Sequence, residues 1–187
     1  KVRSISVWIF IIPFISINAC LLIVTNFHQI LEPGVPINPT FPYFDGGVSI
    51  SRTVRDFPLY LIFKPAMFIT SFLLILYWLN TKKIINHFHK DYSNERKIVF
   101  FGISSAILLT LHSIFLGIKF DNDLYKLFRR VVMLSFIIFE IIAQAYLIKF
   151  FYEIRHKLNK YINITYLKTK RILITFLIII SIITLPF

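Results

Sequence analysis

Residues 127–151 read LFRRVVMLSFIIFEIIAQAYLIKFF, and between Arg130 and Lys149 this stretch carries a single charged side chain, Glu140. A bilayer core about 30 Å thick requires roughly 20 apolar residues in a helix that rises about 1.5 Å per residue. The stretch meets that requirement in length and in composition. It predicts a membrane-spanning helix and makes an integral membrane protein the first hypothesis for the whole chain.

The same template fits four further stretches of the chain. They cover residues 5–25, 57–79, 98–118 and 172–187. The last is short for a span, and the chain opens on Lys1 instead of Met, so we expect a longer protein with a sixth span. The predicted fold class is an all-α integral membrane protein, in which residues 1–187 form a single bundle of five spans.

The composition agrees with this fold class. Of the 187 residues, 57% are hydrophobic, 17% aromatic and 16% charged, whereas soluble domains carry about 25% charged residues. The mean hydropathy is +0.72. Cys20 is the one cysteine of the sequence, so an intrachain disulfide is excluded.

The charge of the chain predicts its topology. The net charge is +12, from 21 Lys and Arg against 9 Asp and Glu. Thirteen of these bases lie before the first span and in the connections 80–97 and 152–171. Because cytoplasmic loops carry an excess of Lys and Arg, we predict a cytoplasmic N-terminus, two basic cytoplasmic loops and an outer loop over residues 26–56. The excess therefore indicates topology, and no nucleic-acid partner is predicted.

The first span has an alternative interpretation as a cleaved signal peptide, since Ile17-Asn18-Ala19-Cys20 resembles a lipoprotein cleavage box. However, the apolar run continues through Val24, which gives the length of a membrane span and exceeds the 7–15 residues of a signal-peptide core. We therefore expect a retained helix.

The outer loop has an unusual pattern of proline and glycine. Prolines recur at every third position from 33 to 42, a spacing that favours extended, polyproline-like backbone. Asp45, Gly46 and Gly47 follow, and two glycines permit a tight reversal of the chain. The pattern indicates an ordered, re-entrant loop, with a simple connection between helix ends as the alternative.

Glu140 is the most informative residue inside a predicted span. A carboxylate near the middle of a bilayer costs about 2.5–3.5 kcal/mol on insertion scales, so Glu140 should face protein or water. Gln144 lies four residues after Glu140 on the same helix face, and Phe136 lies four residues before Glu140 on that face. Two interpretations stay open: a polar or proton-linked site in the bundle, and a hydrogen-bonded carboxyl that holds helices together.

Basic residues near the outer helix ends form a second candidate site, for an anionic lipid head group. These candidates are Arg52, Arg55, Lys64, Arg129 and Arg130. His112 lies at a similar depth to Lys64. The alternative is that these side chains anchor the helices at the membrane surface.

Motifs for catalysis are missing from the sequence, which has no Walker loop, no dinucleotide fingerprint, no HExxH and no GxSxG. His87 and His89 have a spacing seen in metal sites, but other ligands are lacking nearby. Asn163 begins a glycosylation sequon on the predicted cytoplasmic side. No catalytic residue, metal or cofactor is therefore predicted.

The outer loop and second span also carry a resemblance to a known family. Residues 39–53 read PTFPYFDGGVSISRT, residues 57–60 read FPLY, and the span closes with Tyr77 and Trp78. This pattern resembles the six-span family that includes the damage-regulated autophagy modulators, the fibroblast-growth-factor-receptor-activating protein and the Golgi factor for lipid remodelling of GPI anchors. The matching motifs lie within residues 39–80, together with the order of the spans.

The resemblance implies a lipid-handling or membrane-organising role without a defined catalytic centre. It marks Ser49, Ser51, Arg52 and Arg55 as residues that shape the outer site. The lipid-remodelling factor carries a His just before its fourth span, where this chain has Tyr125. Any role of that His is therefore not transferred to this chain.

Three functional hypotheses follow from the sequence. The first is a lipid-handling, lipid-remodelling or trafficking factor whose partners are membrane lipids, such as an anionic phospholipid or glycolipid. The second is an accessory subunit of a larger membrane complex, because the 21 Phe residues offer extensive helix contacts. The third is a transporter or channel component that uses Glu140, Lys64 and His112.

Overall fold

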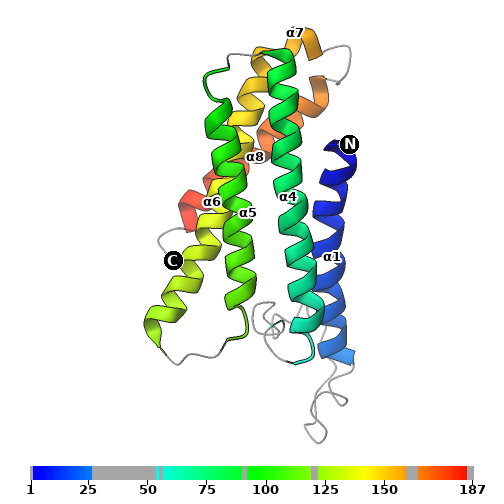
Figure 1. Ribbon diagram of the computed structural model, residues 1–187, viewed down its shortest axis with the longest axis vertical. Helices are drawn as coiled ribbons and strands as arrows, with labels where there is room; N and C mark the ends of the chain where they lie inside the picture. Colours follow the sequence, from blue (N-terminus) through cyan, green and yellow to red (C-terminus); the bar gives the residue numbers. More distant parts are fainter. Residues whose placement is uncertain are drawn as a thin grey trace, which may run out of the picture.

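The protein is described by a computed structural model (Figure 1). The structure describes residues 2–26, 54, 57–89, 92–118, 122–158 and 164–184. Within these ranges the regular elements are α1 (Val2–Asn26), α4 (Tyr60–Phe88), α5 (Glu95–Phe115), α6 (Asp123–Glu153), α7 (Arg155–Leu158) and α8 (Ile164–Thr184). The prediction of an all-helical fold is confirmed for this part of the chain.

Four of these helices, α1, α4, α5 and α6, are long and apolar enough to cross a membrane. They overlap the first four predicted spans, although span 57–79 begins three residues before α4 and span 98–118 ends three residues after α5. Helix α8 differs, because Lys168, Lys170 and Arg171 lie in its first half and leave residues 172–184 as its apolar part. That part is shorter than the roughly 20 residues of a spanning helix, so the fifth span stays a prediction.

The helices pack in chain order. Helix α1 packs on α4, α4 on α5, α5 on α6, and α6 on α8. In Figure 1 the end of α4, the start of α5, α7 and the start of α8 lie at the upper end, and the end of α5 and the start of α6 lie at the lower end. The helix ends that flank the two loops predicted to be cytoplasmic therefore lie at the same end of the molecule.

Local signals explain where α5 and α6 end and begin. Gly117, just after α5, has φ 86°, a left-handed conformation that glycine adopts readily at a helix C-terminus. Asn122 caps α6, because its side chain accepts a hydrogen bond from the Leu124 N–H at 3.0 Å. These two signals fix the end of α5 and the start of α6.

The described core has two clusters. One lies between α4, α5 and α6 and includes Trp78, Ala106, Ala143 and Phe150. The other joins α1, α4 and α5 and includes Cys20, Leu59 and Leu109. Cys20 is fully buried and its Sγ lies 3.7 Å from the Leu59 carbonyl oxygen. Helix α1 is thus packed on α4 through buried contacts, and its retention stays a prediction.

Candidate functional site: a buried carboxyl and a basic helix end

Glu140 lies on the face of α6 that packs against α4 and α5, and its carboxyl group accepts three hydrogen bonds. The Trp78 Nε1–H donates to Oε2 at 3.2 Å, and the Ser105 hydroxyl donates to the same oxygen at 2.7 Å. The Gln144 Nε2–H donates to Oε1 at 2.9 Å. Donors from α4, α5 and α6 itself therefore compensate the desolvation of this carboxyl.

Gly102 makes room for the largest of these donors. A Cβ atom at Gly102 would overlap the Trp78 indole, so only glycine lets α5 approach α4 at this level. Trp78 is fully buried. The absence of one side chain on α5 thus places an indole N–H from α4 against a carboxyl on α6.

Small and hydroxyl-bearing residues continue this contact between α4 and α5 away from Glu140. The Ser71 hydroxyl donates to the Ala106 carbonyl oxygen at 2.6 Å, and its Oγ lies 2.6 Å from Thr110 Oγ1. Hydrogen bonds of this kind replace the hydrophobic driving force that helices lack in lipid. Hydrogen bonds therefore join α4 to α5 along about one turn of α5, from Ala106 to Thr110.

Tyr77 and Lys170 extend the surroundings of the carboxyl. The Tyr77 hydroxyl, which is buried, interacts with the side chains of Gln144 and Thr81. Lys170 in α8 interacts electrostatically with Glu140. Burial lowers the pKa of the Lys170 ammonium, and the Glu140 carboxylate acts on it in the opposite direction. Each of α4, α5, α6 and α8 thus contributes a polar group to the surroundings of Glu140.

The hydrogen bonds allow two protonation states of Glu140. Ser105 Oγ lies 2.8 Å from the Gly102 carbonyl oxygen as well as 2.7 Å from Glu140 Oε2. With an ionised carboxylate, the Ser105 hydroxyl donates to Glu140. With a protonated carboxyl, Glu140 donates to Ser105, which in turn donates to Gly102. The same heavy-atom positions therefore satisfy the hydrogen bonds of either protonation state of Glu140.

A second group of candidate residues lies at the C-terminal end of α5. Lys64 Nζ donates to the Ile114 carbonyl oxygen at 3.4 Å and lies 5.5 Å from the centre of the Tyr60 ring. The Tyr125 hydroxyl donates to the Phe115 carbonyl oxygen at 2.6 Å. Residues from α4 and α6 therefore meet at two consecutive carbonyl groups of α5.

Arg129 is brought to the same helix end through Tyr125. Its guanidinium carbon lies 5.9 Å from the centre of the Tyr125 ring. The Nε atom of Arg129 is buried and has no hydrogen-bond partner within the described residues. Lys64 thus contacts the last turn of α5 directly, whereas Arg129 lies against the ring of Tyr125, whose hydroxyl contacts the same turn.

The remaining sequence candidates lie at other places. His112 is half-buried in the last turn of α5, near the carbonyl that Lys64 contacts, and Arg130 is exposed on α6. The outer-loop candidates Asp45, Gly46, Gly47, Ser49, Ser51, Arg52 and Arg55 lie outside the described residues. Ser105 and Ile114 are about 13 Å apart along α5 at about 1.5 Å per residue, so Glu140 and Lys64 belong to separate sites.

His87 and His89 carry no metal site within the described part of the chain. Their rings contact Phe88 and Tyr92, respectively. No group of three or more His, Cys, Asp or Glu side chains among the described residues is placed to hold a metal ion.

Sequence reasoning singled out Glu140 and Gln144 but did not identify Ser105 and Gly102, and it used Trp78 only as part of a family pattern. A signal for Ser105 and Gly102 was present, since Gly102, Ser105 and Ala106 form a small-residue stripe at helical spacing on α5. Such a stripe marks a close helix contact. Because Glu140 needs hydrogen-bond donors, this stripe on α5 could have been predicted to contact the Glu140 face of α6.

Comparisons of the chain with protein-family models, with curated proteins and with solved structures found no match.

Proposed function

We propose that this protein is a multi-pass membrane protein that handles lipids without catalysing a reaction and holds an anionic head group at the end of the bundle that carries Lys64 and Arg129. The observation that carries the proposal is that Lys64 contacts the last turn of α5 directly and that Arg129 is linked to the same turn through Tyr125. Neither pairs with a carboxylate among the described residues. Phosphate oxygens are the ligands that such cations bind at a membrane surface.

The geometry of this helix end suits a head group better than a buried ion pair. Arg129 presents a buried Nε–H beside the Tyr125 ring, and a guanidinium can bind phosphate oxygens through two parallel hydrogen bonds. Lys64 supplies a point charge at the Ile114 carbonyl. In addition, the family resemblance of residues 39–80 is to proteins with roles in lipid remodelling and membrane organisation.

Native mass spectrometry of the purified protein tests this proposal, with dioleoylphosphatidylglycerol and dioleoylphosphatidylcholine as probes. A cation near a membrane surface is worth about 1 kcal/mol, so the double variant Lys64→Ala/Arg129→Ala should bind phosphatidylglycerol about 30-fold more weakly. Lys126→Ala is the matched control, because Lys126 lies at the same end but pairs with Asp123 at 3.0 Å. Equal affinity of all three proteins for phosphatidylglycerol would contradict the proposal.

A second candidate function is that of a subunit of a larger membrane complex. It is favoured by α8, whose side chains Ile172, Leu173, Phe176 and Ile179 are at least half exposed. Gel filtration in a mild detergent distinguishes the two functions. A particle with fixed partner proteins favours the subunit, and a particle of one chain with its micelle favours the lipid-handling protein.

A further inference from the structure

An apolar groove lies between α6 and α8, on the side of α6 that faces away from Glu140. Its volume is about 580 Å³, within the 300–1,000 Å³ range of small-molecule sites. On α6 its lining residues are Ile138, Ile141, Ile142, Ala145, Tyr146 and Lys149. These positions follow the i, i+3, i+4, i+7 spacing of one helix face, so the groove runs along about three turns of α6.

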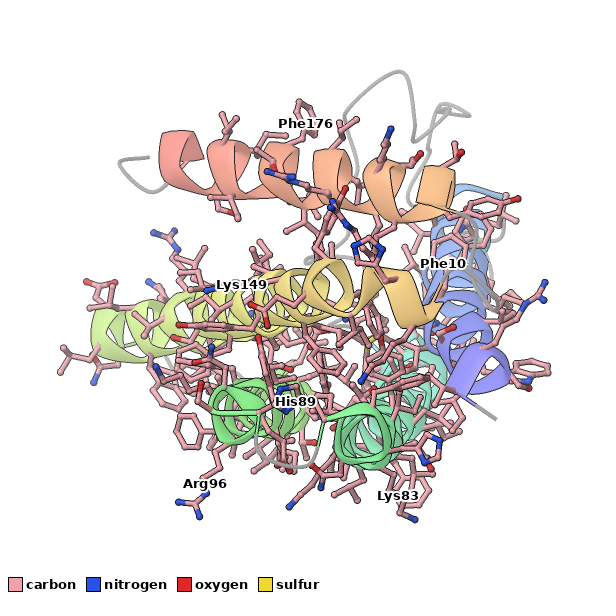
Figure 2. All side chains as sticks on the ribbon, turned by 90° about the horizontal axis from the view of Figure 1, so that it is seen from above. Phe10, Lys83, His89, Arg96, Lys149 and Phe176 are labelled. Atoms are coloured by element: carbon pink, nitrogen blue, oxygen red, sulfur yellow. The ribbon has the colours of Figure 1, made fainter. Side chains whose placement is uncertain are left out.

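Helix α8 forms the other wall of the groove. Ile178 and Ser181 line it from α8, and Phe101 lines it from α5. Figure 2 shows α8 set apart from the other helices, with Phe176 projecting away from α6. Leu167 and Ile174 are the buried residues of α8. Helices α6 and α8 thus leave an open apolar groove between them.

The groove has cations around the end that contains Lys149. Lys149 is exposed, and Lys97 Nζ lies 6.0 Å from the centre of the Tyr146 ring, which lines the groove. Arg171 on α8 lies 5.1 Å from the centre of the Tyr152 ring. Among the described residues none of these three cations pairs with a carboxylate. The groove therefore joins an apolar body to a positively charged end.

We propose that this groove binds one acyl chain of an anionic phospholipid, with the phosphate beside Lys149. The inference rests on the lipid-handling role proposed above and adds a second site, at the opposite end of the bundle from Lys64 and Arg129. The apolar lining excludes a polar ligand along most of the groove. The cationic end complements the phosphate of a membrane lipid.

A phospholipid fits this groove better than a docked helix does. A helix that filled the groove would cover the Lys149 ammonium in an apolar interface, where an unpaired charge is costly. With a lipid in the groove, the aliphatic stem of Lys149 would lie along the acyl chain, and the Lys149 ammonium would lie at the level of the head groups. The same side chain therefore contacts both parts of one lipid.

Native mass spectrometry of the purified protein also tests this site, with dioleoylphosphatidylglycerol as the probe. Lys149→Ala should weaken binding about fivefold, since a cation near the membrane surface is worth about 1 kcal/mol. Ala145→Phe fills the groove and should abolish the same binding event. Lys83→Ala is the control, because Lys83 is exposed on α4 away from the groove (Figure 2), and it should bind as the parent protein does.

The outcomes separate this site from the proposed function. Unchanged phosphatidylglycerol binding in both Lys149→Ala and Ala145→Phe overturns the groove site, whatever Lys64→Ala/Arg129→Ala shows. A loss in the Lys149 and Ala145 variants alone supports the groove and contradicts the site at the end of α5. Binding of glycerol phosphate as strongly as the lipid would also overturn the groove, since its apolar part would then contribute nothing.

Cross-linking tests the alternative that a second copy of the chain fills the groove. Cys20 is buried, so an added cysteine in Ile178→Cys is the accessible thiol. A bifunctional thiol reagent applied in phosphatidylglycerol vesicles should give monomer if a lipid occupies the groove. A cross-linked dimer as the main product would overturn the lipid assignment.

Discussion

The two faces of α6 have nearly the same apolar composition but different surroundings. The face toward α4 and α5 carries Glu140 and Gln144 among the buried residues Ala143, Leu147 and Phe150. The opposite face carries the stripe from Ile138 to Lys149 that lines the groove. Isoleucine, alanine and aromatic residues occur on both, so hydrophobicity alone does not tell the faces apart.

The two faces differ in the surroundings of their ionisable residue. Glu140, near the middle of α6, turns inward to three donors of the bundle. Lys149, nearer the end of the helix, is exposed, and in the proposed lipid site its long stem would reach the level of the lipid head groups. A charge deep in the membrane needs partners in the protein, whereas a charge near the surface can use lipid. The following variants compare the inner and outer faces, in order of expected effect.

Trp78→Ala should give the largest loss of stability. It empties a fully buried site and removes the N–H that donates to Glu140, so the free energy of unfolding should fall by about 3–5 kcal/mol. Unfolding in mixed detergent micelles, followed by circular dichroism, measures this change. Trp8→Ala on α1 is the control, because Trp8 is 53% exposed. Equal losses in the two variants would show that the inner face of α6 does not hold the bundle together.

Gly102→Ala tests the close contact that positions Trp78. The added Cβ would overlap the indole, and such overpacking costs about 1–3 kcal/mol. Ala145→Leu enlarges a residue on the groove face by more atoms, yet it should change the free energy of unfolding by less than about 0.5 kcal/mol. The same micelle assay compares the two. A larger loss in Ala145→Leu than in Gly102→Ala would reverse the assignment of inner and outer faces.

The sequence predicted the helices and the inward orientation of Glu140 because both depend on local information. The apolar length of residues 127–151 predicts a helix, and a central carboxylate needs protein contacts. The identity of its donors depends on which helices are neighbours. Trp78 and Ser105 belong to other helices, and a single sequence does not show which helix faces are in contact. The groove was missed for the same reason, since it exists only where α8 meets α6.

Ser105→Ala and Glu140→Leu form a double-mutant cycle for the inner polar contact. Ser105→Ala removes the donor and Glu140→Leu removes the acceptor of the 2.7 Å hydrogen bond between the two residues. Interhelical hydrogen bonds in membrane proteins are worth about 0.6–2 kcal/mol, so the coupling energy in the micelle unfolding assay should fall in that range. Additive effects would mean that the hydroxyl and the carboxyl do not stabilise each other.

Lys149→Ala should have the smallest effect on stability, and this makes it the most selective test of the two faces. The side chain is exposed and pairs with no described carboxylate, so the free energy of unfolding in detergent should change by less than about 0.5 kcal/mol. In micelles that contain phosphatidylglycerol, the parent protein should gain stability because the lipid binds the folded state, and Lys149→Ala should gain less. Glu140→Gln, changed on the inner face, should keep the full gain from the lipid. An equal gain in the parent protein and Lys149→Ala would show that the outer face is an ordinary lipid-facing surface, because a specific site must couple its ligand to the folded state through the residue that holds it.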